Sequence, residues 1–329
     1  MMKRSVSTVI AGMAIGIGSL SLGGEEPVAG GSPCAGSVHP ARVSYRTVEI
    51  QGMDIFYREA GPEDAPVLLL LHGFPSSGHQ YRELIDRLSD TYRVIAPDYP
   101  GFGMSAAPDV GEFDYTFDRL SEIVVAFIDR LGIETYSLYV FDYGAPVGFR
   151  VASGAPERVD ALIVQNGNAY EEGLGAFWEP IRAFWADPNP VNASAMRGLL
   201  TPDATRWQYT NGVGDPASVA PESWIVDQAL LDRPGNSEIQ LAMFYDYRTN
   251  VALYPEWQSY FREHQPPTLI VWGENDAIFP SEGATPYLRD LPEAELHMLP
   301  TGHFVLEEYA EETATLIRSF MDRRVERTR

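Results

Sequence analysis

The feature that most constrains the fold is a single acid, Asp142, between an apolar run and a helical pattern. Residues 136–141 are apolar and rich in aromatic side chains, which is typical of a buried parallel strand. Small residues follow Asp142, and apolar positions then recur with helical spacing at Val147, Phe149, Val151 and Ala152. A strand, a sharp turn and a helix in this order predict a nucleophile elbow, which lifts one side chain above the end of a sheet. Backbone N–H groups of the new helix then point toward that side chain.

Asp142 has two interpretations from this local pattern. An aspartate at a strand-to-helix junction often caps the helix. As a nucleophile, its carboxylate would attack an alkyl carbon and leave an alkyl ester on the enzyme, whereas a serine at this position attacks acyl carbons. The local pattern favours neither interpretation, so the rest of the chain has to decide between them.

Composition limits the class of protein. The chain has 329 residues, 45% of them hydrophobic, which is enough for a large core in one domain with an insertion, or in two domains. A formal net charge of −22 argues against nucleic acid and anionic membranes as partners. No His/Cys cluster has the spacing of metal ligands, and Gly101 and Gly103 lack the third glycine of a dinucleotide site, so neither a metal nor a cofactor is expected.

The N-terminal region reads as a targeting segment. Lys3 and Arg4 precede an apolar stretch interrupted by glycine and serine, so residues 1–24 predict an export signal. Residues 25–42 predict a flexible linker rich in Gly, Pro and Ser. We therefore expect export to the periplasm or beyond the cell, with the cytoplasm as the alternative. Cys34 is the only cysteine, which excludes an internal disulfide.

Strand and helix patterns alternate over residues 43–167 and again over 266–329. The predicted strands are a hairpin within 48–57 and runs at 67–71, 93–96, 136–141, 161–165, 268–272 and 295–299, and the longest predicted helices are 116–131 and 304–323. This alternation predicts an α/β fold with a mostly parallel, doubly wound sheet. Between them, residues 168–265 are rich in Trp and Tyr, with Pro and Gly breaks and no strand pattern, which predicts a helical lid inserted after the sixth strand.

Reactive residues follow three of the predicted strands. Asp142 follows the first of these, Asp276 lies in the loop after residues 268–272, and His303 follows residues 295–299. Because ligands bind outside the carboxyl ends of the strands in open α/β sheets, these side chains can converge there. The order of nucleophile, acid and histidine is the chain order of the α/β-hydrolase fold.

Several short motifs occur in the same order as in one known family: residues 72–75 (His-Gly-Phe-Pro), 98–105, 142–144 (Asp-Tyr-Gly), Asp276 and 302–303 (Gly-His). Together they resemble an α/β-hydrolase of the epoxide hydrolase and haloalkane dehalogenase group, which uses an aspartate nucleophile. The resemblance extends over residues 43–323. In that family the catalytic acid can also follow the strand before the lid, but this chain has Asn166 and Asn168 there, so we assign the acid to Asp276.

The resemblance implies a mechanism in two steps. Asp142 attacks carbon and forms an ester, and His303, oriented by Asp276, activates the water that hydrolyses the ester. Backbone N–H groups of Phe74 and Tyr143 are the expected oxyanion hole. The resemblance implies no cofactor.

An epoxide would leave as an alkoxide, which needs an acid. Epoxide hydrolases supply that acid from lid tyrosines, and Tyr245 and Tyr247 lie about where the family keeps one of them. His-Gly-Phe-Pro is also the usual oxyanion turn of epoxide hydrolases.

A halide would instead leave as an anion that needs N–H donors. Haloalkane dehalogenases take one from a Trp beside the nucleophile and another from an Asn in the oxyanion turn or from a lid Trp. This chain has Tyr143 and Phe74 at the first two places, although Trp178 or Trp185 of the lid could serve.

We therefore predict an epoxide hydrolase that acts with water on small apolar epoxides. A haloalkane or haloacetate dehalogenase is the alternative, and a non-catalytic relative that binds a small apolar ligand is the alternative outside enzymes. An acyl esterase is disfavoured because a carboxylate that attacks an ester would form an anhydride. The sequence does not determine the oligomeric state.

Overall fold

The computed structural model describes residues 42–324. The predicted export signal, and the predicted linker except for Arg42, lie outside the described residues. Within residues 42–324, none of the helices combines the length and the apolar character that crossing a membrane requires.

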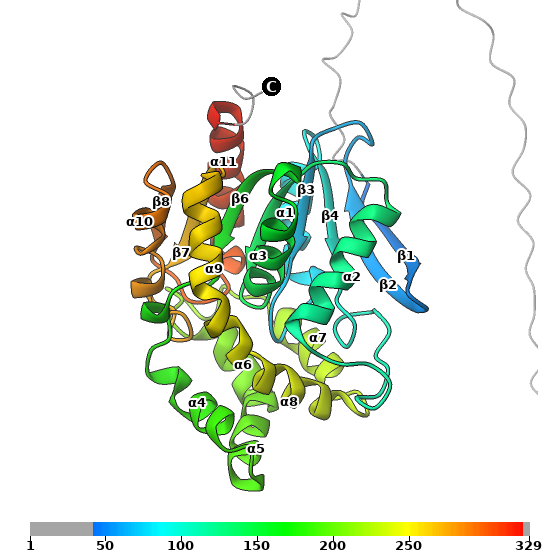
Figure 1. Ribbon diagram of the computed structural model, residues 1–329, viewed down its shortest axis with the longest axis vertical. Coiled ribbons are helices and arrows are strands. Elements are labelled where there is room, and N and C mark those ends of the chain that lie inside the picture. Colours follow the sequence, from blue (N-terminus) through cyan, green and yellow to red (C-terminus); the bar gives the residue numbers. More distant parts are fainter. Residues whose placement is uncertain (1–41, 325–329) are drawn as a thin grey trace, which may run out of the picture. The chain divides into compact units, whose positions relative to one another are not determined.

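The core is a sheet of eight strands in the order β1-β2-β4-β3-β5-β6-β7-β8 (Figure 1). The strands are β1 (Ser44–Ile50), β2 (Met53–Ala60), β3 (Val67–Leu71), β4 (Arg93–Pro97), β5 (Tyr136–Phe141), β6 (Val159–Gln165), β7 (Thr268–Gly273) and β8 (Glu295–Leu299). The β1–β2 and β2–β4 pairs are antiparallel, and all other pairs are parallel.

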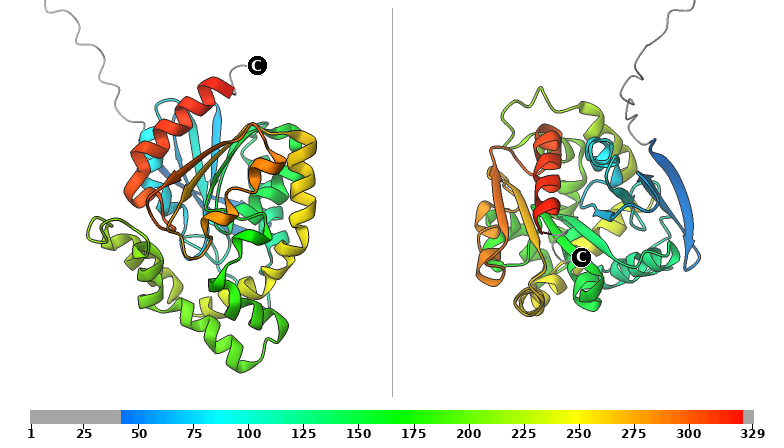
Figure 2. Two further views of the ribbon diagram at one scale, coloured as in Figure 1. Left: turned by 90° about the vertical axis from the view of Figure 1, so that its left-hand side faces the viewer. Right: turned by 90° about the horizontal axis from the view of Figure 1, so that it is seen from above.

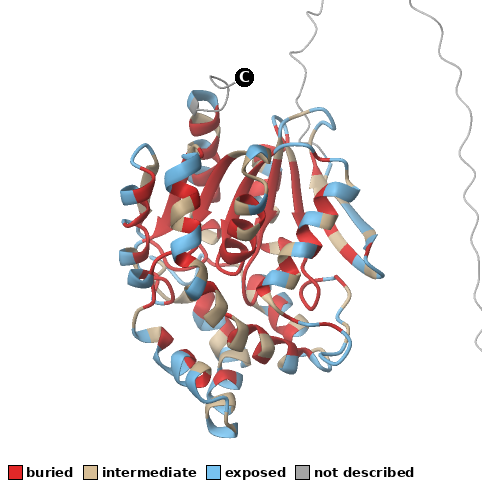
Figure 3. Cartoon of the chain, viewed as in Figure 1, coloured by how far each residue is buried: buried red, intermediate tan, exposed pale blue. Residues whose placement is uncertain are grey.

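Both faces of the sheet are buried because successive side chains of a strand point to opposite sides. In β3, Leu69 and Leu71 belong to one core and Leu68 and Leu70 to the other. The first core lies under α2 (Phe117–Arg130), α3 (Gly144–Gly154) and α9 (Arg248–His264), and the second under α1 (Arg82–Leu88) and α11 (Leu306–Arg324). Figure 3 shows the result, with buried strands between helices whose outer faces are exposed. The all-apolar strand runs follow from this burial on both faces.

These observations confirm the predicted fold class, including the helical insertion after the sixth strand. The helix predicted over 116–131 is α2, which begins at Phe117 because the Thr116 side chain accepts a hydrogen bond from the Arg119 N–H and caps it. The closing helix predicted from residue 304 begins only at Leu306. The residues before it form the loop that carries His303.

The lid, residues 168–265, is helical. Its helices are α4 (Glu179–Ala186), α5 (Pro190–Arg197), α6 (Pro202–Thr210), α7 (Pro221–Leu231), α8 (Asn236–Asp246) and α9. Three of these begin with a proline, which lacks the N–H that a first helical turn leaves unpaired. Figures 1 and 2 show α4 to α8 gathered at one end of the sheet.

A buried carboxylate, Asp98, ties the turn after β4 to two other parts of the core. It is fully buried and accepts hydrogen bonds from the Gly78 N–H at 2.8 Å, the Met104 N–H at 2.8 Å and the Arg58 guanidinium at 3.1 Å. Burial raises the pKa of Asp98, while Arg58 and the two N–H groups lower it. Asp98 thus anchors the residues that follow the His-Gly-Phe-Pro turn.

We expect Asp98→Ala to destabilise the fold by about 3–5 kcal/mol, because it leaves the buried Arg58 charge and two N–H groups unpaired. Asp64→Ala is the matched control, since Asp64 is exposed. Urea unfolding followed by circular dichroism measures both variants. Equal stability of the two variants would show that the Asp98 contacts contribute nothing net.

Candidate active site

Asp142 occupies the turn between β5 and α3, where its φ of +48° is unfavourable for a residue with a side chain. The turn is tight. A Cβ on Gly144 would lie 2.0 Å from the Leu71 carbonyl oxygen, and a Cβ on Gly73 would lie 2.3 Å from the Cβ of Asp142. The small residues after the strand are therefore a steric requirement of the elbow. Asp142 is only 5% exposed, so the turn presents it to the interior.

The Asp142 carboxylate accepts hydrogen bonds from both backbone groups predicted for the oxyanion hole. The Phe74 N–H donates to Oδ1 at 2.6 Å, and the Tyr143 N–H is a second donor. Burial raises the pKa of Asp142 to about 6, although the charge of His303 and these two hydrogen bonds lower it. The residue at the N-cap of α3 is Tyr143, whose side chain makes no capping bond, so capping does not explain Asp142.

His303 lies between the two aspartates. Its Nδ1 is 2.7 Å from Oδ2 of Asp276, and its Nε2 is 3.8 Å from Oδ2 of Asp142. Within residues 42–324, Nε2 has no hydrogen-bond partner. Burial lowers the pKa of His303, but the Asp276 carboxylate and, after it, the Asp142 charge outweigh burial and raise that pKa above its ordinary value. A proton on Nδ1 donates to Asp276, which leaves the lone pair of Nε2 for a water beside Asp142.

Asp276 is fixed by a residue from another loop. Its Oδ2 also accepts a hydrogen bond from Asn166 Nδ2 at 2.7 Å, and its Oδ1 accepts one from the Ile278 N–H at 2.7 Å. Asn166 in turn accepts the Gly273 N–H at 3.0 Å. Sequence reasoning treated Asn166 only as a rival position for the acid and missed this positioning role. A polar residue directly after the apolar strand β6 was the available signal.

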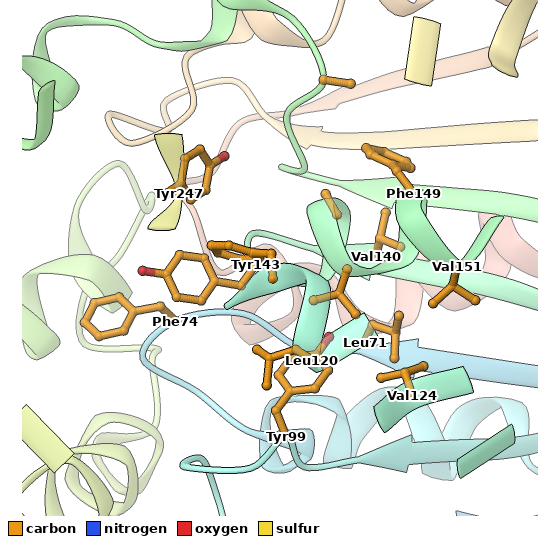
Figure 4. Close-up of a cluster of buried hydrophobic side chains, with 14 of the residues drawn as sticks. Leu71, Phe74, Tyr99, Leu120, Val124, Val140, Tyr143, Phe149, Val151 and Tyr247 are labelled. Carbon is orange, nitrogen blue, oxygen red and sulfur yellow. The ribbon is translucent and has the colours of Figure 1, made fainter. Parts of the chain in front are cut away.

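A small cavity lies between the sheet and the lid. Its lining is mostly apolar, and the polar members are Asp142, Tyr143, Gln208 and Tyr247; the full lining is Phe74, Asp142, Tyr143, Phe177, Trp178, Ile181, Leu199, Gln208, Phe244, Tyr247 and Ile278. In Figure 4 the rings of Phe74, Tyr143 and Tyr247 lie together, and the ring centroids of the two tyrosines are 6.0 Å apart.

Comparisons with known proteins identify the family to which the chain belongs. A model of the alpha/beta hydrolase fold family matches residues 66–191. An uncharacterised hydrolase of Saccharomyces cerevisiae is 41% identical over 271 residues, which are 80% of this chain and 92% of that protein. The chain belongs to the α/β-hydrolase family.

Two further relatives represent the two chemistries that the sequence suggests. A haloalkane dehalogenase of Mycolicibacterium paratuberculosis is 41% identical over 112 residues, which are 34% of this chain and 37% of that protein. The crystal structure of epoxide hydrolase VrEH1 from Vigna radiata aligns with a TM-score of 0.68 at 25% identity, covering 88% of this chain and 99% of that chain. The α/β-hydrolase family is thus established, and the leaving group is not.

Of the four lid residues predicted near the leaving group of this α/β-hydrolase, two line the cavity and two do not. Tyr247 and Trp178 line the cavity with Asp142, whereas Tyr245 and Trp185 are not part of its lining. Tyr245 instead packs against Arg248, whose guanidinium carbon lies 3.7 Å from the ring centroid.

The indole N–H groups of both lid tryptophans are already bound to backbone. Trp178 Nε1 donates to the Ile278 carbonyl at 2.8 Å, and Trp185 Nε1 donates to the Phe244 carbonyl at 2.7 Å. By contrast, the buried hydroxyl of Tyr143 has no hydrogen-bond partner among the described residues, and that of Tyr247 has only the neighbouring Tyr254 hydroxyl beside it.

His72, directly before the oxyanion turn, is structural. It is fully buried, its Nδ1 lies 3.1 Å from the Gly73 carbonyl, and its Nε2 accepts the Tyr99 N–H at 3.2 Å. Burial lowers the pKa of His72 to about 3, so the ring is neutral. Among residues 42–324, no cluster of three or more His, Cys, Asp or Glu side chains could hold a metal ion.

We expect reactions at the Asp142 carboxylate to slow as the pH falls through about 6, because burial raises its pKa to about 6 and protonation removes the nucleophilic charge. The His303→Gln variant isolates this step, since the histidine no longer titrates. The measurement is the rate of covalent modification by a reactive alkyl electrophile against pH, by mass spectrometry. Circular dichroism at each pH is the control for folding.

The charge of His303 lowers the pKa of Asp142 in the native protein. Removing that charge in His303→Gln should therefore move the pH midpoint of the modification rate upward and not downward. A midpoint at about 4, the value of an unperturbed aspartate, would contradict the raised pKa.

Proposed function

We propose that this α/β-hydrolase opens small, largely apolar epoxides to diols. The proposal rests on the kind of donor that lines the cavity with Asp142. These donors are the hydroxyl of Tyr143, which has no partner among the described residues, and that of Tyr247, beside the Tyr254 hydroxyl, whereas the indole N–H groups of Trp178 and Trp185 are bound to backbone carbonyls. A departing epoxide oxygen needs a proton, and a phenol can supply one.

Both phenols are suited to this task because they stay protonated until an alkoxide forms. Burial first, and the charge of Asp142 second, raise the pKa of Tyr143 well above its ordinary value. Burial, the neighbouring Tyr254 hydroxyl and Asp142 do the same to the pKa of Tyr247. Tyr143 thus combines a backbone N–H for the oxyanion hole with a side-chain hydroxyl for the leaving oxygen.

The first step joins substrate to enzyme. A carboxylate oxygen of Asp142 attacks an epoxide carbon, the C–O bond breaks, and its electron pair goes to the ring oxygen. That oxygen takes the phenolic proton of Tyr143 or Tyr247, which becomes a phenolate. The product of this step is a hydroxyalkyl ester on Asp142.

The second step releases the diol. His303 takes a proton from water through Nε2, and the hydroxide adds to the carbonyl carbon of the ester, which belongs to Asp142. The Phe74 and Tyr143 N–H groups stabilise the oxyanion that results. The tetrahedral intermediate expels the diol oxygen, which takes the proton from His303. Asp142 is left as a carboxylic acid and returns its proton to the phenolate, so atoms and protons balance.

A haloalkane dehalogenase is the second candidate, favoured by the relative of that name. The same two hydroxyls could donate hydrogen bonds to a halide without transferring a proton. A haloacetate is a poorer substrate, because no described residue in the cavity lining is a lysine or an arginine that would pair with its carboxylate. A purely binding protein would not need Nε2 of His303 directed at Asp142 and its Nδ1 bonded to Asp276.

We expect Tyr247→Phe and Tyr143→Phe each to slow epoxide opening, by up to about 10²–10⁴-fold for the residue that transfers the proton. The ring is kept, so binding should change little. Tyr245→Phe is the matched control, since this tyrosine lies outside the cavity lining. Diol formation is measured by chromatography. Bromide release from a bromoalkane by the native protein, with no diol formed from any epoxide, would instead favour the dehalogenase.

We expect His303→Gln to form the ester at Asp142 and then stall, because the base acts only in hydrolysis. Intact-protein mass spectrometry after addition of an epoxide should show a persistent increase by the mass of one substrate. The control is the double variant Asp142→Asn/His303→Gln, which should show no increase. An unmodified His303→Gln protein that still consumes substrate would argue against a covalent intermediate.

A further inference from the structure

Gln208 is the one polar side chain of the cavity lining that the proposed mechanism leaves without a role. It is 4% exposed, and its Nε2 has no hydrogen-bond partner among the described residues. A buried amide donor without a partner is unfavourable, and in native proteins such groups are rare. An unpaired amide in the lining of a substrate cavity is explained if the substrate supplies the partner.

The open amide is not the result of a loose helix. On α6, Thr205 donates to a glutamine of α7 at 2.6 Å, and Tyr209 donates to Asp227 at 2.5 Å. The Tyr209 ring also stacks on Phe304, the neighbour of His303, with ring centroids 3.8 Å apart. The residues on both sides of Gln208 are thus held by the lid and by the catalytic loop, and α6 presents the carboxamide at a fixed place.

The chemistry of the lining limits what this amide can bind. A carboxamide is neutral and offers both donors and an acceptor. Asp142 is the only charged side chain among the described lining residues, so a charged substrate group would find no counter-charge beside Gln208. The matching group is therefore a hydroxyl, an ether or a carbonyl oxygen.

We propose that Gln208 is a specificity-determining residue whose carboxamide binds a neutral oxygen group carried by the substrate away from its reacting carbon. The inference rests on the proposed function, because it uses the same cavity. It refines the expected substrate from a wholly apolar epoxide to an epoxide with an apolar body and one neutral polar substituent. Only such a substrate gives the buried amide a hydrogen-bond partner.

The test compares pairs of epoxides that differ only at the end of the chain opposite the epoxide ring. 1,2-Epoxyalkanes of increasing chain length carry either a terminal hydroxyl or a methyl group of similar size. For the length that spans the cavity, we expect the native protein to prefer the hydroxyl compound about 10-fold in kcat/KM. Gln208→Met keeps the length of the side chain and removes the amide, and it should abolish this preference, mainly through KM for the hydroxyl compound.

Leu199→Met is the matched control, because it changes the same lining without removing a polar group. It should affect both members of a pair alike and keep the preference for the hydroxyl. The thermal unfolding temperature of Gln208→Met should stay equal or rise, since the variant removes an unpaired buried group. A lower unfolding temperature with no change in preference would assign Gln208 a structural role and overturn the proposal.

The same comparison with terminal bromoalkanes, by mass spectrometry on the His303→Gln background, separates the two proposals. If only the bromides modify Asp142 and their hydroxyl preference depends on Gln208, the epoxide function fails and the role of Gln208 stands.

Calorimetric binding of diols with and without the terminal hydroxyl gives the comparison without turnover. Equal affinity at every chain length, or an equal loss for both members of each pair in Gln208→Met, would overturn the role of Gln208.

Discussion

The structure of the site depends on a buried carboxylate that is kept in place by backbone donors. Asp142 is almost fully buried at a positive φ, and the Phe74 N–H reaches its Oδ1 at 2.6 Å. Burial raises its pKa to about 6, and the hydrogen bonds and His303 keep that pKa from rising further. The same N–H groups are correctly placed for an oxyanion on this carboxylate, so one arrangement serves both the ground state and the expected intermediate.

The parallel sheet explains how distant parts of the chain reach this carboxylate. Each reactive loop follows the carboxyl end of a strand, and neighbouring strands bring those ends to one edge. Hydrogen bonds then fix the details, as Asn166 from the loop after β6 holds Asp276 and Asp276 orients His303. The turn anchored by Asp98 is bonded to the residue before the oxyanion turn, since the Tyr99 N–H donates to His72, and it is held by contacts of the same kind.

The lid supplies most of the side chains that surround the carboxylate in the cavity. The indole N–H groups of Trp178 and Trp185 donate to backbone carbonyls of the protein. The other donors of the lining are the hydroxyls of Tyr247 and of Tyr143 from the elbow, and the amide of Gln208, none of which is bound to a backbone carbonyl. These donors fit the proposed substrate, which has an oxygen that needs a proton at one end and a neutral polar group at the other.

The sequence by itself determined the fold and the positions of Asp142, Asp276 and His303, because apolar strand runs, turn residues and chain order are local signals. It could not separate Tyr245, in the last turn of α8, from Tyr247, which lies two residues further at the junction of α8 and α9. It also gave no sign that Gln208 lines the cavity that contains Asp142. Those assignments depend on which way each lid helix faces and on which backbone carbonyls are free, and only the packing of the lid against the sheet decides them.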